Sequence, residues 1–273
     1  MNDIFLYLAQ PFAQHALVAA ALVAITCGLI GPFVVMRGMA FAVHGTSELA
    51  FTGAAGGLLL GNNPVAGAFV GALVVAGLIG TLGNRERERD ASIGVILAFG
   101  LGLGVLLLSF YHGFATEATN ILFGYIFGVS TGQLIILGVI GLLTTVAMLV
   151  MFRPLLFASI DPEVAAAKGV PVRLLGILFL LILALTVTAA AQIVGTLLVL
   201  SLAITPAAAA ALWSASPLKV TVLSVLFALT ASVGGLLLSL QFSHVKASVF
   251  ITSLSFVIYL TARIWGNKRI LKG

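Results

Sequence analysis

Two ionisable residues, His44 and Glu48, lie four positions apart inside an apolar stretch of this chain. On a helix, residues at this spacing share one face, so the imidazole and the carboxylate are close enough to share one ion or one proton. An imidazole together with a carboxylate suits zinc, manganese or ferrous iron. The pair therefore predicts a site through which a metal ion passes. A proton relay and a mutually satisfied pair that joins two helices are the alternatives.

The neighbours of this pair can assist the same chemistry. Thr46 and Ser47 lie between the two ionisable residues and offer hydroxyl oxygens as further ligands. Gly45 allows local unwinding of a helix, which would expose backbone carbonyls to a passing cation. We therefore expect the metal site to extend beyond the two side chains.

A second informative segment, 161–169, is hydrophilic and lies between apolar stretches. Asp161 is a favourable N-cap, Glu163 complements the positive end of a helix, and Gly169 can end the helix in a left-handed conformation. A helix over about 160–170 has only a few turns, which is too short to cross a bilayer core of ~30 Å. The segment predicts an element that docks on a partner; an ordinary capped loop helix is the alternative.

Further polar residues fall in predicted outer loops. His112 and Glu117 lie in the loop 111–119, and His244 precedes the last apolar stretch. They are candidate outer contacts for a metal ion, with ordinary solvated loops as the alternative.

A helix break or hinge is predicted around the stretch 193–213. The candidate residues are Gly195, Thr205 and Pro206. Proline removes one backbone hydrogen bond, and threonine can help to satisfy the group that is left. A gating hinge and a plain structural kink both fit this pattern.

The composition indicates the kind of structure that positions these residues. Of the 273 residues, 61% are hydrophobic and 8% are charged, and the mean hydropathy is +1.24. Too few polar groups remain to cover a soluble globule, so the chain is predicted to be an all-α polytopic membrane protein. Each crossing needs about 20 apolar residues, which gives eight or nine transmembrane helices. The predicted spans are 15–36, 39–61, 64–83, 91–110, 120–152, 172–191, 193–213, 219–240 and 247–264.

The stretch 120–152 is too long for one simple span, so we expect 120–130 to form a short separate or re-entrant helix. The N-terminus lacks the features of a cleavable signal peptide, and the first span is expected to be retained. No soluble domain, linker or internal repeat is evident in the sequence. Residues 1–273 are therefore interpreted as a single transmembrane domain.

The lysines and arginines predict the orientation. When the spans alternate across the membrane, nearly all of these cations fall on one side and only Lys246 falls on the other. The cation-rich side is expected to be cytoplasmic, and it holds the segment 161–169 and the C-terminus. His44 and Glu48 then lie roughly 10 to 17 Å into the membrane, counting ~1.5 Å per residue from Arg37. The pI of about 9.7 therefore reflects topology and not nucleic-acid binding.

Nothing in the sequence predicts an enzyme. It has no phosphate-binding Gly-x-x-x-x-Gly-Lys-Ser/Thr loop, no paired cysteines for zinc and no nucleophile arrangement of a soluble hydrolase. If ATP drives this protein, another chain hydrolyses it. The few ionisable residues inside the apolar spans are therefore the best markers of a pathway or a binding site.

Several segments resemble the membrane permease subunit of ABC importers for zinc, manganese and iron. Residues 34–41, Val-Val-Met-Arg-Gly-Met-Ala-Phe, are similar to the family's signature at the start of its second helix. In the family an Asp-x-x-x-His pair normally follows; here the pair reads His44-x-x-x-Glu48, with the ligand types exchanged and the spacing kept. Further similar segments are 122–130, 161–173, 194–199 and 204–207. The segments follow the family's order, and the resemblance extends over nearly the whole chain.

The resemblance implies a mechanism. In these importers a short cytoplasmic helix inserts into the ATPase, two permeases pair around one path, and an extracytoplasmic binding protein delivers the metal. The resemblance thus implies ATPase coupling through Asp161, Glu163 and Gly169, and a metal path at His44 and Glu48. It implies a homodimer in a bacterial cytoplasmic membrane that imports manganese or zinc, with iron as a further candidate. ATP would bind to the partner subunit, and no cofactor would be bound permanently.

Two other functions compete with this interpretation. A proton-coupled secondary metal carrier would use His44 and Glu48 for protons and would work without an ATPase. An ABC permease for a chelated metal, such as a siderophore, would have a wide pathway without a two-ligand constriction.

Overall fold

The described part of the chain is helical throughout. The computed structural model describes residues 10–61, 63–82, 86–111, 126–242 and 245–270, and within these ranges it contains no strand. The elements are α2 (Pro11–Met36), α3 (Ala40–Gly61), α4 (Pro64–Leu82), α5 (Glu86–Ser109), the 3-10 turn η1 (Ile126–Gly128), α7 (Thr131–Ile160), α8 (Pro162–Ala167), α9 (Val172–Val194), α10 (Thr196–Ala211), α11 (Pro217–Gln241) and α12 (Ala247–Ile270).

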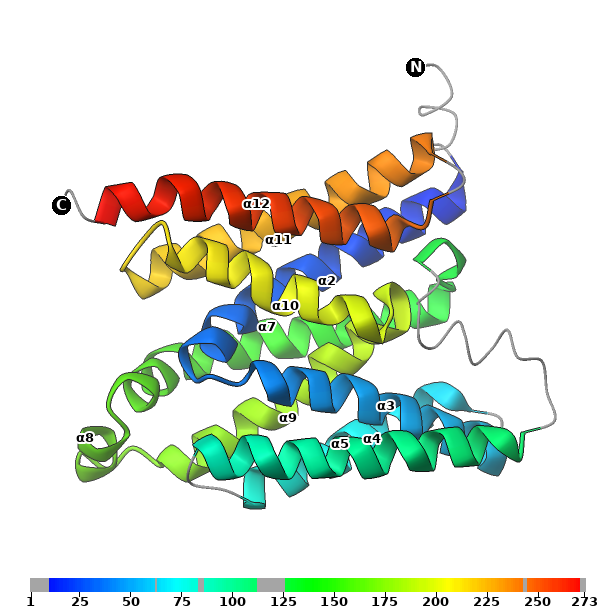
Figure 1. The fold of residues 1–273 in the computed structure, drawn as a ribbon, viewed down its shortest axis with the longest axis horizontal. Coiled ribbons are helices and arrows are strands. Elements are labelled where there is room, and N and C mark those ends of the chain that lie inside the picture. Colours follow the sequence, from blue (N-terminus) through cyan, green and yellow to red (C-terminus); the bar gives the residue numbers. More distant parts are fainter. Residues whose placement is uncertain (1–9, 62, 83–85, 112–125, 243–244, 271–273) are drawn as a thin grey trace.

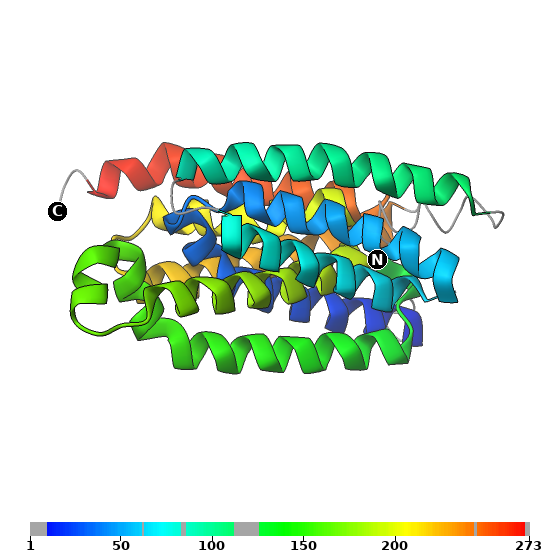
Figure 2. The ribbon, with the colours of Figure 1, turned by 90° about the horizontal axis from the view of Figure 1, so that it is seen from below.

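The long helices pack side by side in an elongated bundle (Figures 1 and 2). In Figure 1, α12, α11, α10 and α2 occupy one side of the bundle and α3, α4 and α5 the other. Contacts join α3 to α4 and α5, and they join α2 to α10 and α11. Helix α9 contacts members of both groups, including α2, α10, α3 and α4. It therefore connects the two halves of the bundle.

One end of the bundle carries several of the chain's cations. The C-terminal ends of α2, α7 and α12 lie at this end together with the short helix α8 (Figures 1 and 2). Arg37 directly follows α2, Arg153 lies in the last part of α7, and Arg173 lies in the first turn of α9. The orientation predicted from the sequence places these cations together on the cytoplasmic side. Their position at one end of the bundle is consistent with that prediction.

Five of the described helices are long and apolar enough to cross a membrane. They are Pro11–Met36, Thr131–Ile160, Val172–Val194, Pro217–Gln241 and the part Ala247–Gly266 of α12. Three shorter apolar helical segments, Pro64–Gly80, Ile93–Ser109 and Val199–Ala211, are also present. Helix α3 is not among these segments, because His44, Glu48 and their polar neighbours interrupt its apolar character. The all-helical class is thus confirmed, and the count of eight or nine spans stays a prediction.

The predicted span 120–152 differs most from the structure. Helix α7 begins only at Thr131, where Ser130 and Gln133 form a reciprocal capping box, and it continues to Ile160. The sequence interpretation ended this span at 152, but Arg153 and Pro154 are both accommodated in the helix. Before α7 the structure has the single turn η1, and residues 120–125 lie outside the described part. The capping box explains why the helix starts where it does, since it satisfies two backbone donors at once.

Glycine permits the closest helix contact in the bundle, between α3 and α4. A Cβ atom at Gly53 would overlap the carbonyl oxygen of Gly67, and a Cβ at Gly71 would lie 2.8 Å from the carbonyl oxygen of Leu49. Gly57 in turn faces the backbone of Gly67. Such contacts let membrane helices approach through their backbones. These glycines therefore serve helix packing, and they fix α3 against α4.

Candidate metal-passage site

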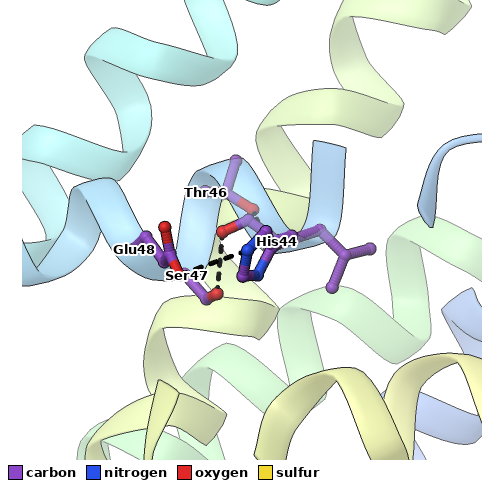
Figure 3. Close-up of polar contacts among 5 residues, drawn as sticks. His44, Thr46, Ser47 and Glu48 are labelled. Carbon is purple, nitrogen blue, oxygen red and sulfur yellow. Dashed lines mark hydrogen bonds and ion pairs between the residues drawn. The ribbon is translucent and has the colours of Figure 1, made fainter. Parts of the chain in front are cut away.

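His44 and Glu48 form a close pair on α3. The Nε2 atom of His44 lies 3.2 Å from the Oε1 atom of Glu48, and the two side chains are 32% and 16% exposed. Figure 3 shows both side chains leaving the helix on the same side. The other ring nitrogen, Nδ1, is buried and has no hydrogen-bond partner among the described residues. With Nε2–H donated to the carboxylate, Nδ1 carries an unused lone pair, which is the form of imidazole that binds a metal ion.

The turn that places this pair is determined by Gly38. Gly38 has a φ of 61°, and it donates from its backbone N–H to the carbonyl of Val35 at 3.3 Å. The N–H of Met39 donates to the carbonyl of Val34 at 2.9 Å. This pair of bonds around a left-handed glycine is the Schellman ending of a helix. It ends α2 and lets α3 begin at Ala40, so that His44 lies in the second turn of α3.

The residues between the pair do not have the roles expected from the sequence. Thr46 is fully buried and donates from its hydroxyl to the carbonyl of Ala42 at 2.9 Å. Figure 3 shows its side chain on the opposite side of the helix from His44 and Glu48. Ser47 is also fully buried and donates to the carbonyl of His44 at 2.9 Å. Serine and threonine in apolar helices commonly bond back to the preceding turn in this way. Both residues are fully buried, so neither hydroxyl oxygen is exposed to a passing ion in this conformation.

Gly45 is likewise not a point of unwinding. Helix α3 runs without interruption from Ala40 to Gly61. A Cβ atom at Gly45 would lie 3.0 Å from Cγ2 of Ile93, so the missing side chain makes room for α5. The expected exposure of backbone carbonyls at Gly45 is therefore not seen, and the glycine has a packing role.

The described residues around the pair do not by themselves form a complete metal site. Among the described residues no group of three or more His, Cys, Asp or Glu side chains could hold an ion. A transition-metal ion takes four or more ligands in most protein sites. Within the described residues, the pair offers an ion two side-chain ligands.

Three predicted outer contacts fall outside the described residues. They are His112, Glu117 and His244. Their assignment as outer metal contacts therefore stays a prediction.

The segment expected to dock on a partner forms a capped helix. Asp161 accepts a hydrogen bond from the N–H of Val164 at 3.0 Å, and Gly169 ends the helix with a φ of 83°. The N–H of Val170 donates to the carbonyl of Ala165 at 3.0 Å, which completes a second Schellman ending. Ala165 is fully buried, whereas Glu163 and Val164 are exposed. The helix thus has one face against the bundle and one face free at its end.

Of the three residues predicted for a helix break or hinge, Gly195 is the one at which the structure separates two helices. Helix α9 ends at Val194 and α10 begins at Thr196, with Gly195 between them at a φ of 97°. Pro206 and Thr205 lie inside α10, which continues without interruption to Ala211. A left-handed glycine interrupts the backbone here, because residues with a side chain rarely adopt this conformation.

One contact was not anticipated from the sequence. The guanidinium of Arg37 lies over the ring of Phe179 in α9, 5.6 Å from the ring centroid. The sequence interpretation used Arg37 as a marker of the cytoplasmic side and as part of the segment 34–41, and it gave the side chain no contact.

Comparison with known proteins identifies the family. A sequence profile of the family described as "ABC 3 transport family" matches residues 9–266. The chain belongs to the ABC 3 transport family. The resemblance seen in the sequence is thereby confirmed.

Relatives of this ABC 3 family chain carry names that refer to metals. It is 31% identical to the manganese import system permease protein ScaB of Streptococcus gordonii, over 96% of this chain and 94% of that protein. It is 27% identical to the high-affinity zinc uptake system membrane protein ZnuB of Haemophilus influenzae, over 90% of this chain and 95% of that protein. With the manganese transport system membrane protein MntC of Halalkalibacterium halodurans the identity is 34%, over 69% of this chain and 65% of that protein.

Solved structures agree with the ABC 3 family assignment. The structure of PsaBC from Streptococcus pneumoniae in complex with Fab has a chain with a TM-score of 0.88 and 32% identity, covering 99% of this chain and 98% of that one. A metal-chelate type ABC transporter in an inward-facing conformation has a TM-score of 0.72 at 17% identity, covering 92% and 85%. The second likeness concerns the fold alone.

Proposed function

We propose that this chain is the membrane permease subunit of an ATP-driven importer of a divalent transition metal ion, manganese or zinc, with iron as a further candidate. The observation that carries the proposal is the pair of His44 and Glu48, an imidazole and a carboxylate 3.2 Å apart on a helix of a membrane permease family. The names of the relatives ScaB and ZnuB support the two leading metals. The chain itself is not an enzyme in this proposal, and the ATP is bound and hydrolysed by a separate subunit.

The pair has suitable chemistry for a transient stop on a translocation path. Without metal, the carboxylate of Glu48 and the Nε2–H of His44 satisfy each other, and only the Nδ1 lone pair of the imidazole has no partner among the described residues. A metal ion that arrives replaces this contact with bonds to the carboxylate and to an imidazole lone pair. Two ligands bind an ion more weakly than the full set of a structural site, so the ion can leave again. This property suits passage better than storage.

The proposed active form is a homodimer with the pair at its centre. One chain supplies two ligands, and a second copy related by a two-fold axis supplies a matching pair. Four nitrogen and oxygen ligands then face one point on the path. This arrangement explains how a helix with only two ionisable side chains can serve a transition metal.

The remaining parts of the proposal concern partners and location. Helix α8, with Asp161, Glu163 and Gly169, is proposed to dock on the cytoplasmic ATPase, because its exposed face lies at the cation-rich end of the bundle. An extracytoplasmic metal-binding protein delivers the ion at the other end, where His112, Glu117 and His244 are proposed contacts. The chain spans a bacterial cytoplasmic membrane eight or nine times and acts as a single domain, residues 1–273.

The break between α9 and α10 is proposed to act as a hinge. Gly195 has the left-handed backbone that separates the two helices, and Thr205 and Pro206 weaken the hydrogen bonding further along α10. Movement at this break would change the angle between α10 and α9. Helix α10 contacts α3, so such movement reaches the helix of the metal pair.

The competing functions have less support. Membership of the ABC 3 transport family favours an ATP-driven permease over a proton-coupled secondary carrier. The likeness to a metal-chelate type transporter, at 17% identity, carries fold information and does not favour a chelated substrate. The close His44–Glu48 pair favours a bare ion, which needs ligands from the protein.

Uptake into proteoliposomes tests the proposal. The permease would be reconstituted with its proposed ATPase and binding-protein partners, and uptake of radioactive manganese and zinc would be measured in competition, with iron as a third competitor. We expect uptake that requires ATP, persists when the proton gradient is dissipated, and is lost in His44→Ala and in Glu48→Ala. His15→Ala, a half-buried histidine near the start of α2, is the control. Uptake without ATP that collapses with the proton gradient would instead identify a secondary carrier.

A further inference from the structure

Arg37 makes an unusual contact for a residue at the end of a membrane helix. Its guanidinium lies 5.6 Å from the centroid of the Phe179 ring, and Phe179 is fully buried in α9. The Nη2 atom of Arg37 also lies 3.6 Å from the position that a Cβ atom at Gly176 would occupy. The guanidinium therefore lies against the surface of α9 beside Gly176. Arg37 therefore packs against a neighbouring helix, and it does not simply extend toward water.

The C-terminal end of α2 contacts both helices that flank α8 in the chain. Phe33 of α2 is fully buried, with its ring 5.5 Å from that of Phe152 in α7 and 6.1 Å from that of Phe179 in α9. Helix α7 precedes α8 in the chain and α9 follows it, and α8 contacts both. A displacement of α8 therefore acts on two helices that both contact the C-terminal end of α2. Aromatic contacts in a packed interior resist sliding, so they can transmit such a displacement.

The end of α2 is connected to α3 without a flexible linker. The N–H of Arg37 donates to the carbonyl of Phe33 at 3.0 Å, and the Schellman bonds around Gly38 fix the following residues. The N–H of Val43 already donates to the carbonyl of Met39 at 3.2 Å, within the first turn of α3. His44 is the next residue. A shift of the α2 terminus is therefore passed directly to the helix of the metal-passage pair.

We propose that Arg37 is a positioning residue that couples movement of α8 to the His44–Glu48 pair through its contact with Phe179. The inference rests on the proposed function, since it assigns a route between the docking helix and the metal path of the same permease. Arginine suits this role because its planar, permanently charged guanidinium stacks on an aromatic ring and gains strength where water is scarce. The competing explanation is that Arg37 acts only as a cytoplasmic anchor of the topology.

The number of manganese ions transported per ATP hydrolysed separates the two explanations. Wild type, Arg37→Ala, Arg37→Lys, Phe179→Leu and the double variant Arg37→Ala with Phe179→Leu would be reconstituted with the ATPase and the binding protein. We expect the ratio to fall by about threefold or more in Arg37→Ala and Phe179→Leu, which is the range of one cation–π contact. Arg37→Lys should restore part of the ratio, and the double variant should be no worse than Arg37→Ala alone.

Arg153→Ala provides the matched control. Arg153 is an exposed cation in α7 at the same end of the bundle, so its loss removes an equal charge without the ring contact. We expect its transport ratio to equal that of wild type. Copurification of the ATPase and the melting temperature of each complex are measured in parallel, and both should change little in Phe179→Leu, which keeps the charge and most of the apolar volume.

The outcomes separate this inference from the proposed function. If wild type transports no metal with ATP, the proposed function is wrong. If wild type transports metal and the ratio is unchanged in Phe179→Leu, or if Arg153→Ala lowers it as much as Arg37→Ala, the coupling role is wrong and Arg37 is an anchor. If Arg37→Ala fails to assemble, Phe179→Leu alone decides, because the charge and the topology signal remain in place.

Discussion

The hydroxyl of Thr52 donates a hydrogen bond to the backbone carbonyl of Gly100, at 2.7 Å, across the contact of α3 with α5. Thr52 follows Glu48 by one helical turn, so this bond fixes the rotation of the helix face that carries the metal-passage pair. The position of Gly104 supports the same contact, because a Cβ atom there would lie 2.9 Å from the Thr52 hydroxyl. The two helices thus meet at close range beside the pair.

Replacing Thr52 by Val should weaken this contact without changing its shape. Hydrogen bonds between membrane helices average about 0.6 kcal/mol, so we expect a loss of about 0.5 to 1.5 kcal/mol of stability, measured by thermal unfolding in detergent. Thr252→Val is the control, because the exposed Thr252 hydroxyl bonds only within its own helix, to the carbonyl of Ser248. Equal melting temperatures for Thr52→Val and wild type would show that the bond does not stabilise the bundle.

Exchanging the two members of the metal pair should preserve part of the function. In the double variant His44→Glu with Glu48→His the ligand set and the spacing survive, so we expect uptake of manganese between that of wild type and that of either alanine variant. Membrane expression should be unchanged in all of them. If the exchanged variant is as inactive as His44→Ala, the two residues do not act as interchangeable ligands.

The ending of α8 should be sensitive to a side chain at Gly169. Its φ of 83° is unfavourable for any residue with a Cβ atom, and valine is among the least tolerant because of its branched side chain. We expect Gly169→Val to lower both transport and metal-stimulated ATP hydrolysis, while the membrane spans still insert. Glu163→Lys should act in the same direction through the positive N-terminal end of the helix. Normal copurification of the ATPase with unchanged uptake in both variants would contradict the docking role of α8.

The contact of α3 with α4 should not accept even a methyl group. Gly53→Ala places a Cβ atom against the Gly67 carbonyl, so the helices must separate, and we expect a loss of stability of about 1 to 3 kcal/mol. Gly77→Ala is the matched control in α4, because no atom lies within 4 Å of its added Cβ. That variant should be neutral or slightly stabilising, since alanine is the better helix former. Thermal unfolding of the purified proteins measures both effects, and similar melting temperatures for the two variants would contradict the predicted clash.

Local chemistry explains what could be predicted from the sequence. The capped helix α8 follows from Asp161 and Gly169, because capping bonds involve residues only a few positions apart. The spacing of His44 and Glu48 similarly predicts a shared helix face. The long apolar stretches predicted helices because a membrane-spanning backbone has to satisfy its own hydrogen bonds.

Features that depend on distant residues could not be predicted in this way. The sequence alone suggested free hydroxyls at Thr46 and Ser47, but the contacts of α3 with other helices bury both. Helix α7 continues past Arg153 and Pro154 although each residue is a common signal for a helix end. The stacking of Arg37 on Phe179 joins residues far apart in the chain, and no local pattern specifies it.

The polarity of α3 affects how the protein must enter the membrane during synthesis. Five described helices are apolar enough to be recognised singly as spans, and α3 is not one of them. Charged and polar residues in a helix centre disfavour insertion by up to about 3 kcal/mol each. A helix of this kind is expected to enter the bilayer together with a neighbour, and its glycine contacts make α4 the closest one. The polar residues of α3 are therefore expected to make its insertion depend on pairing with a neighbouring helix.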